Sequence, residues 1–307
     1  MDSQLSFRRL EVFRLVVDER SVTRAAEILM VAQPAVSAQL RALESWVGAT
    51  LFVRRGNRLV LTEAGERTNE WAKNVLAGAA QVRRDVGDLA SGDTGRVLVA
   101  SSMAVGTYLL APILATVGKE RPKAEITVSI SRPEEVVRGV ETGEFDFAVL
   151  NWDEREFSDA TTSEVLSSVQ LSVYATTDLV ADGATLSLGE ALSLPLVGAP
   201  REVVYQRNLV AQLRNLGHDE PHFVIRLGHS EAMVRAAVEH DWAIIAPEYA
   251  VGAGGPLRPV DVPDFRIEEQ IVLVHRRDKH FSPLQEAALG AIRSGLSRMA
   301  PPRDHRE

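Results

Sequence analysis

The chain has 307 residues, 45% of them apolar and 25% charged, the composition of an ordinary folded protein long enough for about two domains. It contains no cysteine, which excludes a disulfide framework, a thiolate metal site and a cysteine nucleophile. The formal net charge of −8 argues against a polyanionic partner for the chain as a whole, but residues 1–92 hold 13 Lys and Arg against 11 Asp and Glu. Residues 1–92 therefore carry +2 and residues 93–307 carry −10, an asymmetry that indicates two parts with different partners.

Three short helices are predicted at the start of the chain. Apolar residues recur at helical spacing over residues 5–17. Ser21 is placed to cap a second helix. Gln33 and Pro34 begin a third helix, which runs to about Glu44, because proline is favourable in the first turn where its missing N–H has no partner.

Two short strands follow these helices. Gly48 ends the helical region, and residues 51–53 and 59–61 have the apolar, β-branched character of strands joined by an arginine-rich turn. The order helix, helix, turn, helix and β-wing predicts a winged helix-turn-helix domain over residues 1–62.

A long helix is predicted next, over residues 63–92, with Thr62 as its cap and acidic residues in its first turn. Its apolar residues recur at steps of three and four residues, which is the narrow seam by which two long helices pair. The alternative is a helix packed along the core of its own chain, which usually has a wider apolar stripe. The seam, which predicts a dimerisation helix, comprises Ala72, Val75, Ala79, Val82, Val86 and Leu89.

The second half of the chain alternates strand and helix patterns, which predicts an α/β fold with helices on both faces of a sheet. The predicted strands are residues 96–100, 124–131, 145–150, 165–175, 196–198, 223–227, 242–246 and 267–275. The predicted helices are residues 103–120, 133–142, 202–216, 230–240 and 283–299, with a turn or short helix at 186–192.

Residues 7–65 carry a dense set of spaced motifs. They are Ser21-x-Thr23-x-Ala25-Ala26-x-x-Leu29, Gln33-Pro34-Ala35-Val36-Ser37, Leu43-Glu44, Gly48-x-x-Leu51-Phe52-x-Arg54 and Leu61-Thr62-x-Ala64-Gly65. In these motifs the segment resembles the DNA-binding domain of the LysR-type transcriptional regulators. It departs from them at Ala38, where many relatives carry Arg, and at Ala32, where a capping Ser or Thr is frequent.

A recognition helix enters the major groove with its N-terminal residues first. Gln33 is suited to a bidentate contact with adenine, and Ala35 to the methyl group of thymine; as an alternative, Gln33 only caps its helix. The wing arginines are suited to phosphates or to the minor groove, or else form a solvated hairpin tip. The expected DNA-contacting residues are Thr23, Arg24, Gln33, Pro34, Ala35, Ser37, Arg41, Arg54, Arg55 and Arg58.

The resemblance extends to the second half through residues 96–102, 139–149 and 234–247. It implies an effector-binding domain over residues 93–307, built from two α/β subdomains like a type 2 periplasmic binding protein. Subdomain I would comprise about 93–161 and 267–300, and subdomain II about 162–266. His240-Asp241-Trp242 stands where the family usually has Gly-x-Gly, which puts the geometry of that edge of the cleft in question. The resemblance also implies a homodimer or a homotetramer of two dimers, promoter DNA as partner and RNA polymerase as a further candidate partner.

An effector is expected beyond the carboxyl ends of the strands, where helix N-termini point into the crevice. Backbone N–H groups and Arg132 suit a small organic anion, although the serines are equally well explained as helix caps and Arg132 as a surface charge. The residues nominated for effector binding are Ser101, Ser102, Met103, Ser131, Arg132, Asn151, Gly198, His229 and Ser230.

Other functions have weaker support in the sequence. Gly228-His229-Ser230-Glu231-Ala232 is close to the nucleophile elbow of hydrolases, but its last glycine is replaced by alanine. A small-molecule binding protein would use only the second half of the chain. We expect no catalytic residue, cofactor or metal site, and we expect a cytoplasmic protein, since no export signal and no apolar run of ~20 residues are present.

Overall fold

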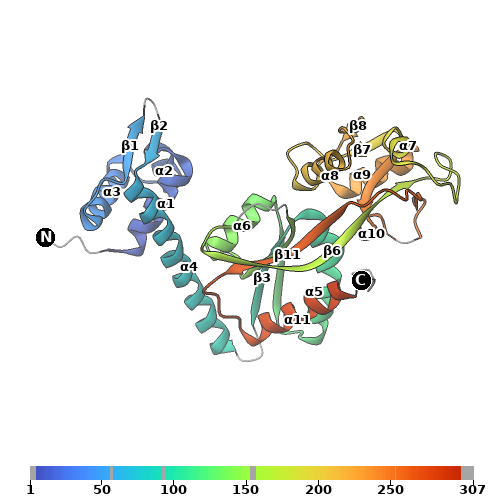
Figure 1. Cartoon of the computed structure of the whole chain (residues 1–307). Coiled ribbons are helices and arrows are strands. Elements are labelled where there is room, and N and C mark those ends of the chain that lie inside the picture. The colour runs from blue at the N-terminus through green and yellow to red at the C-terminus, as the bar shows by residue number, and fades with distance from the viewer. Residues whose placement is uncertain (1–4, 56–57, 92–94, 153–156, 253, 299–307) are drawn as a thin grey trace, which may run out of the picture. The chain divides into compact units, whose positions relative to one another are not determined.

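The computed structural model describes residues 5–55, 58–91, 95–152, 157–252 and 254–298. Contacts between Cα atoms divide the chain into two compact units, residues 1–87 with 141–144 and residues 88–140 with 145–307 (Figure 1). No helix in the described part of the chain is long and apolar enough to cross a membrane.

The first unit has the winged helix-turn-helix fold that the sequence predicts. Its elements are α1 (Phe7–Glu19), α2 (Val22–Ile28), α3 (Gln33–Val47), β1 (Phe52–Arg55), β2 (Arg58–Leu61) and α4 (Glu63–Ser91). Ser21 caps α2 as predicted, because its hydroxyl accepts from the backbone N–H of Arg24 at 3.2 Å. Gly48 ends α3 in the left-handed conformation, with φ of 77°, so the helix runs beyond its predicted end at Glu44.

Two side chains of the sequence motifs join the elements of this unit. Glu44, near the end of α3, accepts a hydrogen bond from the backbone N–H of Leu51 at 2.8 Å. Thr62 caps α4 by accepting from the N–H of Gly65 at 2.9 Å, and its hydroxyl donates to the carbonyl oxygen of Thr50 at 2.7 Å. The motif residues Glu44 and Thr62 therefore fix where the wing lies against the helices.

The second unit is built on one mixed sheet. Its strands are β3 (Arg96–Ser101), β4 (Glu125–Ile130), β5 (Phe147–Trp152), β6 (Thr161–Ala175), β7 (Leu196–Gly198), β8 (Phe223–Arg226), β9 (Ala243–Pro247), β10 (Arg258–Pro259) and β11 (Glu268–Arg276). They lie in the order β4-β3-β5-β11-β6-β9-β7-β8, and β10 pairs with β6. The helical segments are η1 (Val105–Leu110, a π-helix), α5 (Ala111–Glu120), α6 (Pro133–Glu141), α7 (Leu188–Leu192), α8 (Val204–Asn215), α9 (Ser230–Glu239), α10 (Glu248–Val251) and α11 (Pro283–Ser297).

The α/β class is confirmed, and several details differ from the prediction. The helix predicted over residues 103–120 begins as the π-helix η1, and β6 starts at Thr161 rather than at residue 165. The short elements α10 and β10 were not predicted, because the Gly- and Pro-rich sequence around them has neither helical nor alternating spacing.

The long antiparallel strands β6 and β11 connect two groups of parallel strands. β11 pairs with β5 on one side, and the C-terminal part of β6 pairs with β9 on the other. β6 and β11 pair with each other from Glu268↔Gln170 to Arg276↔Thr161, with a register shift between Ile271 and Val272. We call the part with β3, β4 and β5 the first lobe, and the part with β7, β8 and β9 the second lobe.

Each lobe buries both faces of its part of the sheet. Val99 of β3 and Phe147 of β5 lie on one face of the sheet and pack against η1, α5 and α11. Ala100 and Ala148 lie on the other face, which α6 covers (Figure 1). In the second lobe, α7 and α8 cover one face and α9 the other. Helices on both faces of mainly parallel strands leave the carboxyl ends of those strands as the edge at which side chains can meet a ligand.

Candidate functional site

The predicted DNA-contacting side chains lie on the solvent side of the first unit. Val36, Leu40 and Leu43 bury one face of α3, and this leaves the other face of that helix open. Ser37 is half-buried, and the side chain of Arg58 lies outside the described residues. The exposed members of the predicted set are Thr23, Arg24, Gln33, Pro34, Ala35, Arg41, Arg54 and Arg55.

The first turn of α3 is available to a ligand. Ala32 occupies the N-cap position, its backbone is extended, and no side chain caps the helix. Gln33 is therefore not the cap, and its amide makes no hydrogen bond to another described residue. Backbone N–H groups at the start of a helix carry partial positive charge, which favours a phosphate or another hydrogen-bond acceptor there.

The predicted arginines differ in their electrostatic surroundings. Arg24 donates to Glu27 at 2.9 Å and lies 3.9 Å from Glu19, so its positive charge is already partly balanced. Within the described part of the chain, no ion pair is formed by Arg41, Arg54 or Arg55. These three arginines offer the more available positive charge on the first unit.

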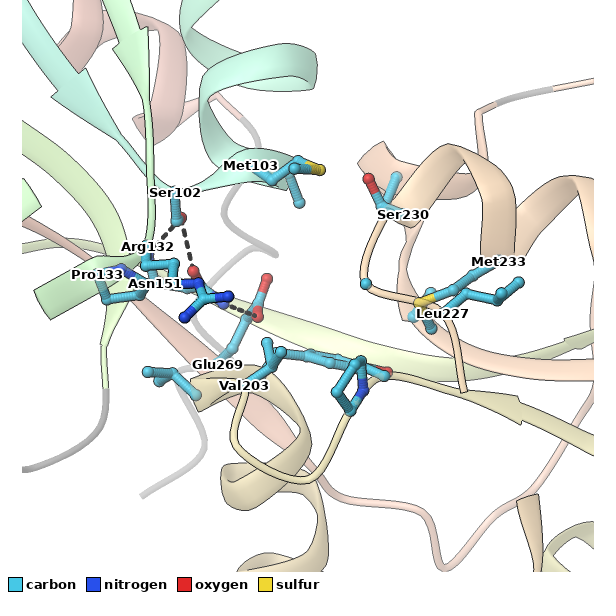
Figure 2. A pocket seen from close by; sticks show the side chains of 18 of the residues that line it. Ser102, Met103, Arg132, Pro133, Asn151, Val203, Leu227, Ser230, Met233 and Glu269 are labelled. Atoms are coloured by element: carbon cyan, nitrogen blue, oxygen red, sulfur yellow. Dashed lines mark hydrogen bonds between the residues drawn. The ribbon is translucent and has the colours of Figure 1, made fainter. Parts of the chain in front are cut away.

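The second unit contains a cavity of about 720 Å³ between its two lobes (Figure 2). This volume is in the range of small-molecule sites. Six of the nine residues nominated for effector binding line it, namely Ser102, Met103, Ser131, Arg132, Asn151 and Ser230.

The other three nominated residues do not line the cavity. Ser101 is fully buried, and its hydroxyl donates to the carbonyl oxygen of Val149 at 2.5 Å. Gly198 packs against an aromatic ring, since a Cβ built on it would be 2.3 Å from Phe223. His229 is the exposed N-cap of α9. The sequence placed each of them after a strand but could not show which way the chain turns there.

A hydrogen-bonded chain of four residues crosses the base of the cavity. Ser102 donates to Oδ1 of Asn151 at 2.6 Å, and Nδ2 of Asn151 donates to Oε2 of Glu269 at 3.3 Å. The hydroxyl of Tyr249 donates to Oε1 of Glu269. Ser102 and Asn151 belong to the first lobe, and Tyr249, which follows β9 of the second lobe, packs against the apolar core of the first. Figure 2 shows the hydrogen bonds that join Ser102, Asn151 and Glu269.

Sequence reasoning missed Glu269, Tyr249 and Tyr205. Glu269 is only 5% exposed, although its neighbour Glu268 is exposed, because side chains alternate between the faces of a strand. Glu269 lies near the start of a strand that otherwise buries apolar residues on the same face, and this mismatch was the one available signal. Burial raises the pKa of the Glu269 carboxyl, an effect that the hydrogen bonds from Tyr249 and Asn151 reduce.

The same environment raises the pKa values of the two tyrosines that line the cavity. Burial, and then the nearby charge of Glu269, raise the pKa of the hydroxyls of Tyr205 and Tyr249. Tyr205 donates to the carbonyl oxygen of Ile245, and Tyr249 donates to Glu269. Both phenols therefore remain neutral donors.

The hydrolase-like motif lacks the geometry of a nucleophile. The Oγ of Ser230 is buried and has no hydrogen-bond partner among the described residues, so no base is in place to activate it. In the described part of the chain, no group of three or more His, Asp or Glu residues could hold a metal ion.

The turn His240-Asp241-Trp242 does not border the cavity. Asp241 adopts the left-handed conformation, with φ of 52°, which glycine would adopt more easily. Its carboxylate accepts from the hydroxyl of Thr176 at 2.8 Å, and the rings of His240 and Trp242 stack with centroids 4.7 Å apart. None of the three residues lines the cavity, although Trp242 packs against the apolar cluster that includes Ile244.

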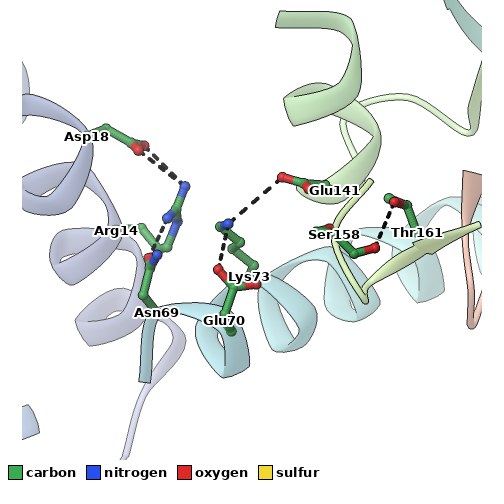
Figure 3. A network of polar contacts seen from close by, with 8 residues as sticks. All are labelled: Arg14, Asp18, Asn69, Glu70, Lys73, Glu141, Ser158 and Thr161. Atoms are coloured by element: carbon green, nitrogen blue, oxygen red, sulfur yellow. Dashed lines mark hydrogen bonds and ion pairs between the residues drawn. The ribbon is translucent and has the colours of Figure 1, made fainter. Parts of the chain in front are cut away.

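The helix α4 is attached to the first unit by polar and aromatic contacts. Arg14 of α1 donates to Asn69 of α4 and to Asp18, as Figure 3 shows. Trp46 of α3 stacks on Trp71 of α4, with ring centroids 5.4 Å apart and an angle of 19° between the planes. The direction of the first turns of α4 is thereby coupled to that of α3.

The predicted seam of α4 divides into two parts. Ala72 is fully buried and Val75 packs against the core of the winged helix, so these positions serve the chain's own fold. Ala79 is half-buried, and Val82 is 60% exposed. The side chains of Val86 and Leu89 lie outside the described residues. An exposed valine in an apolar seam is a candidate contact with a second chain.

Comparison with known proteins gives two matches to protein families. The family described as "LysR substrate binding domain" matches residues 90–297, and the family described as "Bacterial regulatory helix-turn-helix protein, lysR family" matches residues 7–66. Together they cover both parts of the chain.

The individual proteins to which this chain is similar share a low sequence identity with it. A probable RuBisCO transcriptional regulator of Trieres chinensis is 33% identical over 150 residues, 49% of this chain and 48% of that protein, so the matched stretch spans about half of the relative's length. A full-length OxyR variant from Pseudomonas aeruginosa is similar in structure, with a TM-score of 0.64 and 17% identity over 99% of each chain. Full-length CbnR in complex with its target DNA has a TM-score of 0.55 and 21% identity, and the match covers 95% of this chain and 100% of that one. At 17% and 21% identity, the similarity to these two structures shows the fold alone.

Proposed function

Since the chain belongs to the LysR family of bacterial regulatory proteins, we propose that it is a sequence-specific, DNA-binding transcriptional regulator controlled by a small-molecule effector. The observation that carries this proposal is the open first turn of α3, with Gln33 exposed, together with the wing arginine Arg54, which forms no ion pair with any described residue. This arrangement suits base contacts from the helix and backbone contacts from the wing.

Two chains, each with its own recognition helix and wing, must bind the DNA together. One helix reads only a few base pairs, and the net charge of +2 on residues 1–92 gives modest electrostatic attraction to DNA. A homodimer joined through α4, or a tetramer of two dimers, would place two recognition helices on half-sites about 10 bp or a multiple of it apart. Linking the two surfaces raises the overall affinity without new contacts.

The cavity is the effector site of this proposal, with subdomain I at residues 93–161 and 267–300 and subdomain II at residues 162–266. The separate apolar cores of the two lobes support two subdomains, although Leu166 and Val169 of β6 pack against the core of the first lobe and Ile267 belongs to the core of the second. An effector that contacts both lobes would favour one arrangement of them over another, and that differential affinity is what can change the assembly on DNA. In this proposal the partner is promoter DNA, and RNA polymerase is a further partner. The protein would act in the cytoplasm.

Selection from random DNA tests this function. The full chain is incubated with a pool of random duplexes, and the bound fraction is sequenced after several rounds. We expect enrichment of two related half-sites at a spacing of one helical turn or a multiple, and an affinity for the selected duplex that falls steeply with salt. A pool that shows no enriched sequence, or binding that salt does not change, would contradict the proposal.

A further inference from the structure

The charges around the cavity do not favour a bare anion. Four acidic side chains line it, Glu134, Glu135, Glu202 and Glu269, against two arginines, Arg132 and Arg207, so the lining carries a formal charge of −2. Arg207 also donates to the carbonyl oxygen of Glu202, whereas Arg132 forms no ion pair with any described residue. A ligand that matches this lining carries positive as well as negative charge.

Glu269 differs from the other acidic groups of the cavity because it is buried. The other three are exposed to solvent, whereas Glu269 is 5% exposed. Its two carboxylate oxygens accept hydrogen bonds from neutral donors, Tyr249 and Asn151, and within the described part of the chain it forms no ion pair. A buried carboxylate without a countercharge is costly, so a cation that entered the cavity would relieve that cost.

Arg132 and Ser230 supply the complementary chemistry. Arg132 lies at the start of α6, and Figure 2 shows it on the side of the cavity that Asn151 and Glu269 occupy. Ser230 lies across the cavity, with a buried hydroxyl that has no partner among the described residues. An arginine matches a carboxylate in geometry as well as in charge, and an unpaired buried hydroxyl gains from any polar ligand atom.

We propose that the cavity binds a zwitterionic ligand of the α-amino-acid class, with its ammonium group on Glu269 and its carboxylate on Arg132. The remaining wall, which includes Leu227, Met233 and Ile244, is apolar and would surround the ligand's side chain. The inference rests on the proposed function, since it specifies the effector of that regulator. The raised pKa of Glu269 supports it, because a buried acid that resists ionisation alone becomes favourably ionised beside an ammonium group.

Matched sets of three compounds test the ligand class with the full chain. Each set contains an L-amino acid, the corresponding carboxylic acid without the amino group, and the corresponding amine without the carboxylate; L-leucine, 4-methylpentanoate and 3-methylbutylamine form one set. The melting temperature of the protein is recorded with each compound, because a ligand that binds the folded state raises it. We expect at least one amino acid to raise the melting temperature while its two partial analogues have little effect.

Substitutions at Glu269 and Arg132 test the two proposed contacts with the ligand. Glu269→Gln keeps the shape of the side chain and removes its charge, and Glu268→Gln makes the same change at the exposed neighbour outside the cavity lining. For the amino acid that binds, calorimetry should give a dissociation constant about tenfold or more weaker for Glu269→Gln, the loss expected for a charge-assisted hydrogen bond, and unchanged for Glu268→Gln. Arg132→Gln, at an exposed position, should weaken binding similarly and keeps the test decisive if Glu269→Gln does not fold.

Three results would overturn the inference: no amino acid binds, the carboxylic acids bind as tightly as the amino acids, or Glu269→Gln and Arg132→Gln bind as tightly as the unmodified chain. DNA selection with the same preparation separates this failure from a failure of the regulator function. Selective DNA binding without amino-acid binding would reject only the ligand class.

Discussion

Gly65 lies so close to Leu51 that a Cβ atom built on the glycine would be 2.1 Å from the carbonyl oxygen of the leucine. This contact brings the first turn of α4 against the residue that precedes the wing strand β1. The same carbonyl accepts a hydrogen bond from the N–H of Thr62 at 3.0 Å, so it is held in place. Glycine at this motif position is therefore required by the fold of the winged helix.

Replacement of Gly65 by alanine should destabilise the protein by about 1–3 kcal/mol, the usual cost of overpacking a closely packed site. Gly78→Ala in the same helix is the matched control, since a Cβ there meets nothing within 4 Å. The control should stabilise α4 slightly, by about 0.5–1 kcal/mol, because alanine favours the helix. Urea unfolding of both variants measures the difference, and equal effects at the two positions would refute the close contact.

Gln33→Ala should weaken binding to the selected duplex. It should also reduce the protein's preference for one base over the others at a single position by about 1–3 kcal/mol. The reason is that Gln33 is exposed in the first turn of α3 and is not used as a cap. Gln39→Ala removes the same amide from another face of the same helix and should leave the preference unchanged. Fluorescence anisotropy with duplexes changed at single positions measures both, and an equal loss on every sequence would show that Gln33 does not read a base.

Arg54→Ala should weaken binding to all duplexes and reduce the slope of log affinity against log salt by about 1, as expected for one lost phosphate contact. Arg24→Ala is the comparison, because Glu27 and Glu19 already balance part of its charge. We expect a smaller change of slope for Arg24. Anisotropy at graded salt gives the slopes, and an unchanged slope for Arg54→Ala would place that residue away from the DNA backbone.

Val82→Asp should dissociate the proposed homodimer, because it would bury an unpaired charge in the apolar seam of α4. In a single chain Val82 is 60% exposed, so the substitution should not prevent folding. Asn74→Asp adds the same charge at an exposed position of α4 outside the seam and should leave the dimer intact. Sedimentation velocity compares the two variants, and an intact dimer of Val82→Asp would exclude the seam as the contact.

The stability of the protein should depend on pH through Glu269. Its pKa is raised in the folded state by burial, so the folded chain holds this proton more tightly than the unfolded chain does. The stabilisation is complete below the unfolded pKa of about 4.3 and is lost as the pH rises through the folded pKa. Glu269→Gln lacks this term, so the free energy of unfolding of the unmodified chain should fall relative to that of the variant over this window. A pH-independent difference in urea unfolding would contradict the raised pKa.

The sequence by itself determined the winged helix of the first unit. The caps Ser21 and Thr62, the helix end at Gly48 and the apolar spacing of α1 to α3 act over a few residues, so local patterns were sufficient to predict these elements. The exposed side of α3 followed from the same periodicity, because the residues that do not pack into the core must face solvent. The α/β class of the second unit was predicted in the same way.

The tertiary structure alone decided the cavity. Glu269, Asn151 and Tyr249 are brought together from β11, β5 and α10 by strand pairing that no local pattern encodes. Ser101, Gly198 and His229 do not line the cavity, although each follows or ends a strand as the sequence suggested. Whether a side chain at a strand end faces a ligand depends on the register of its neighbours, and that is set by the packing of the whole sheet.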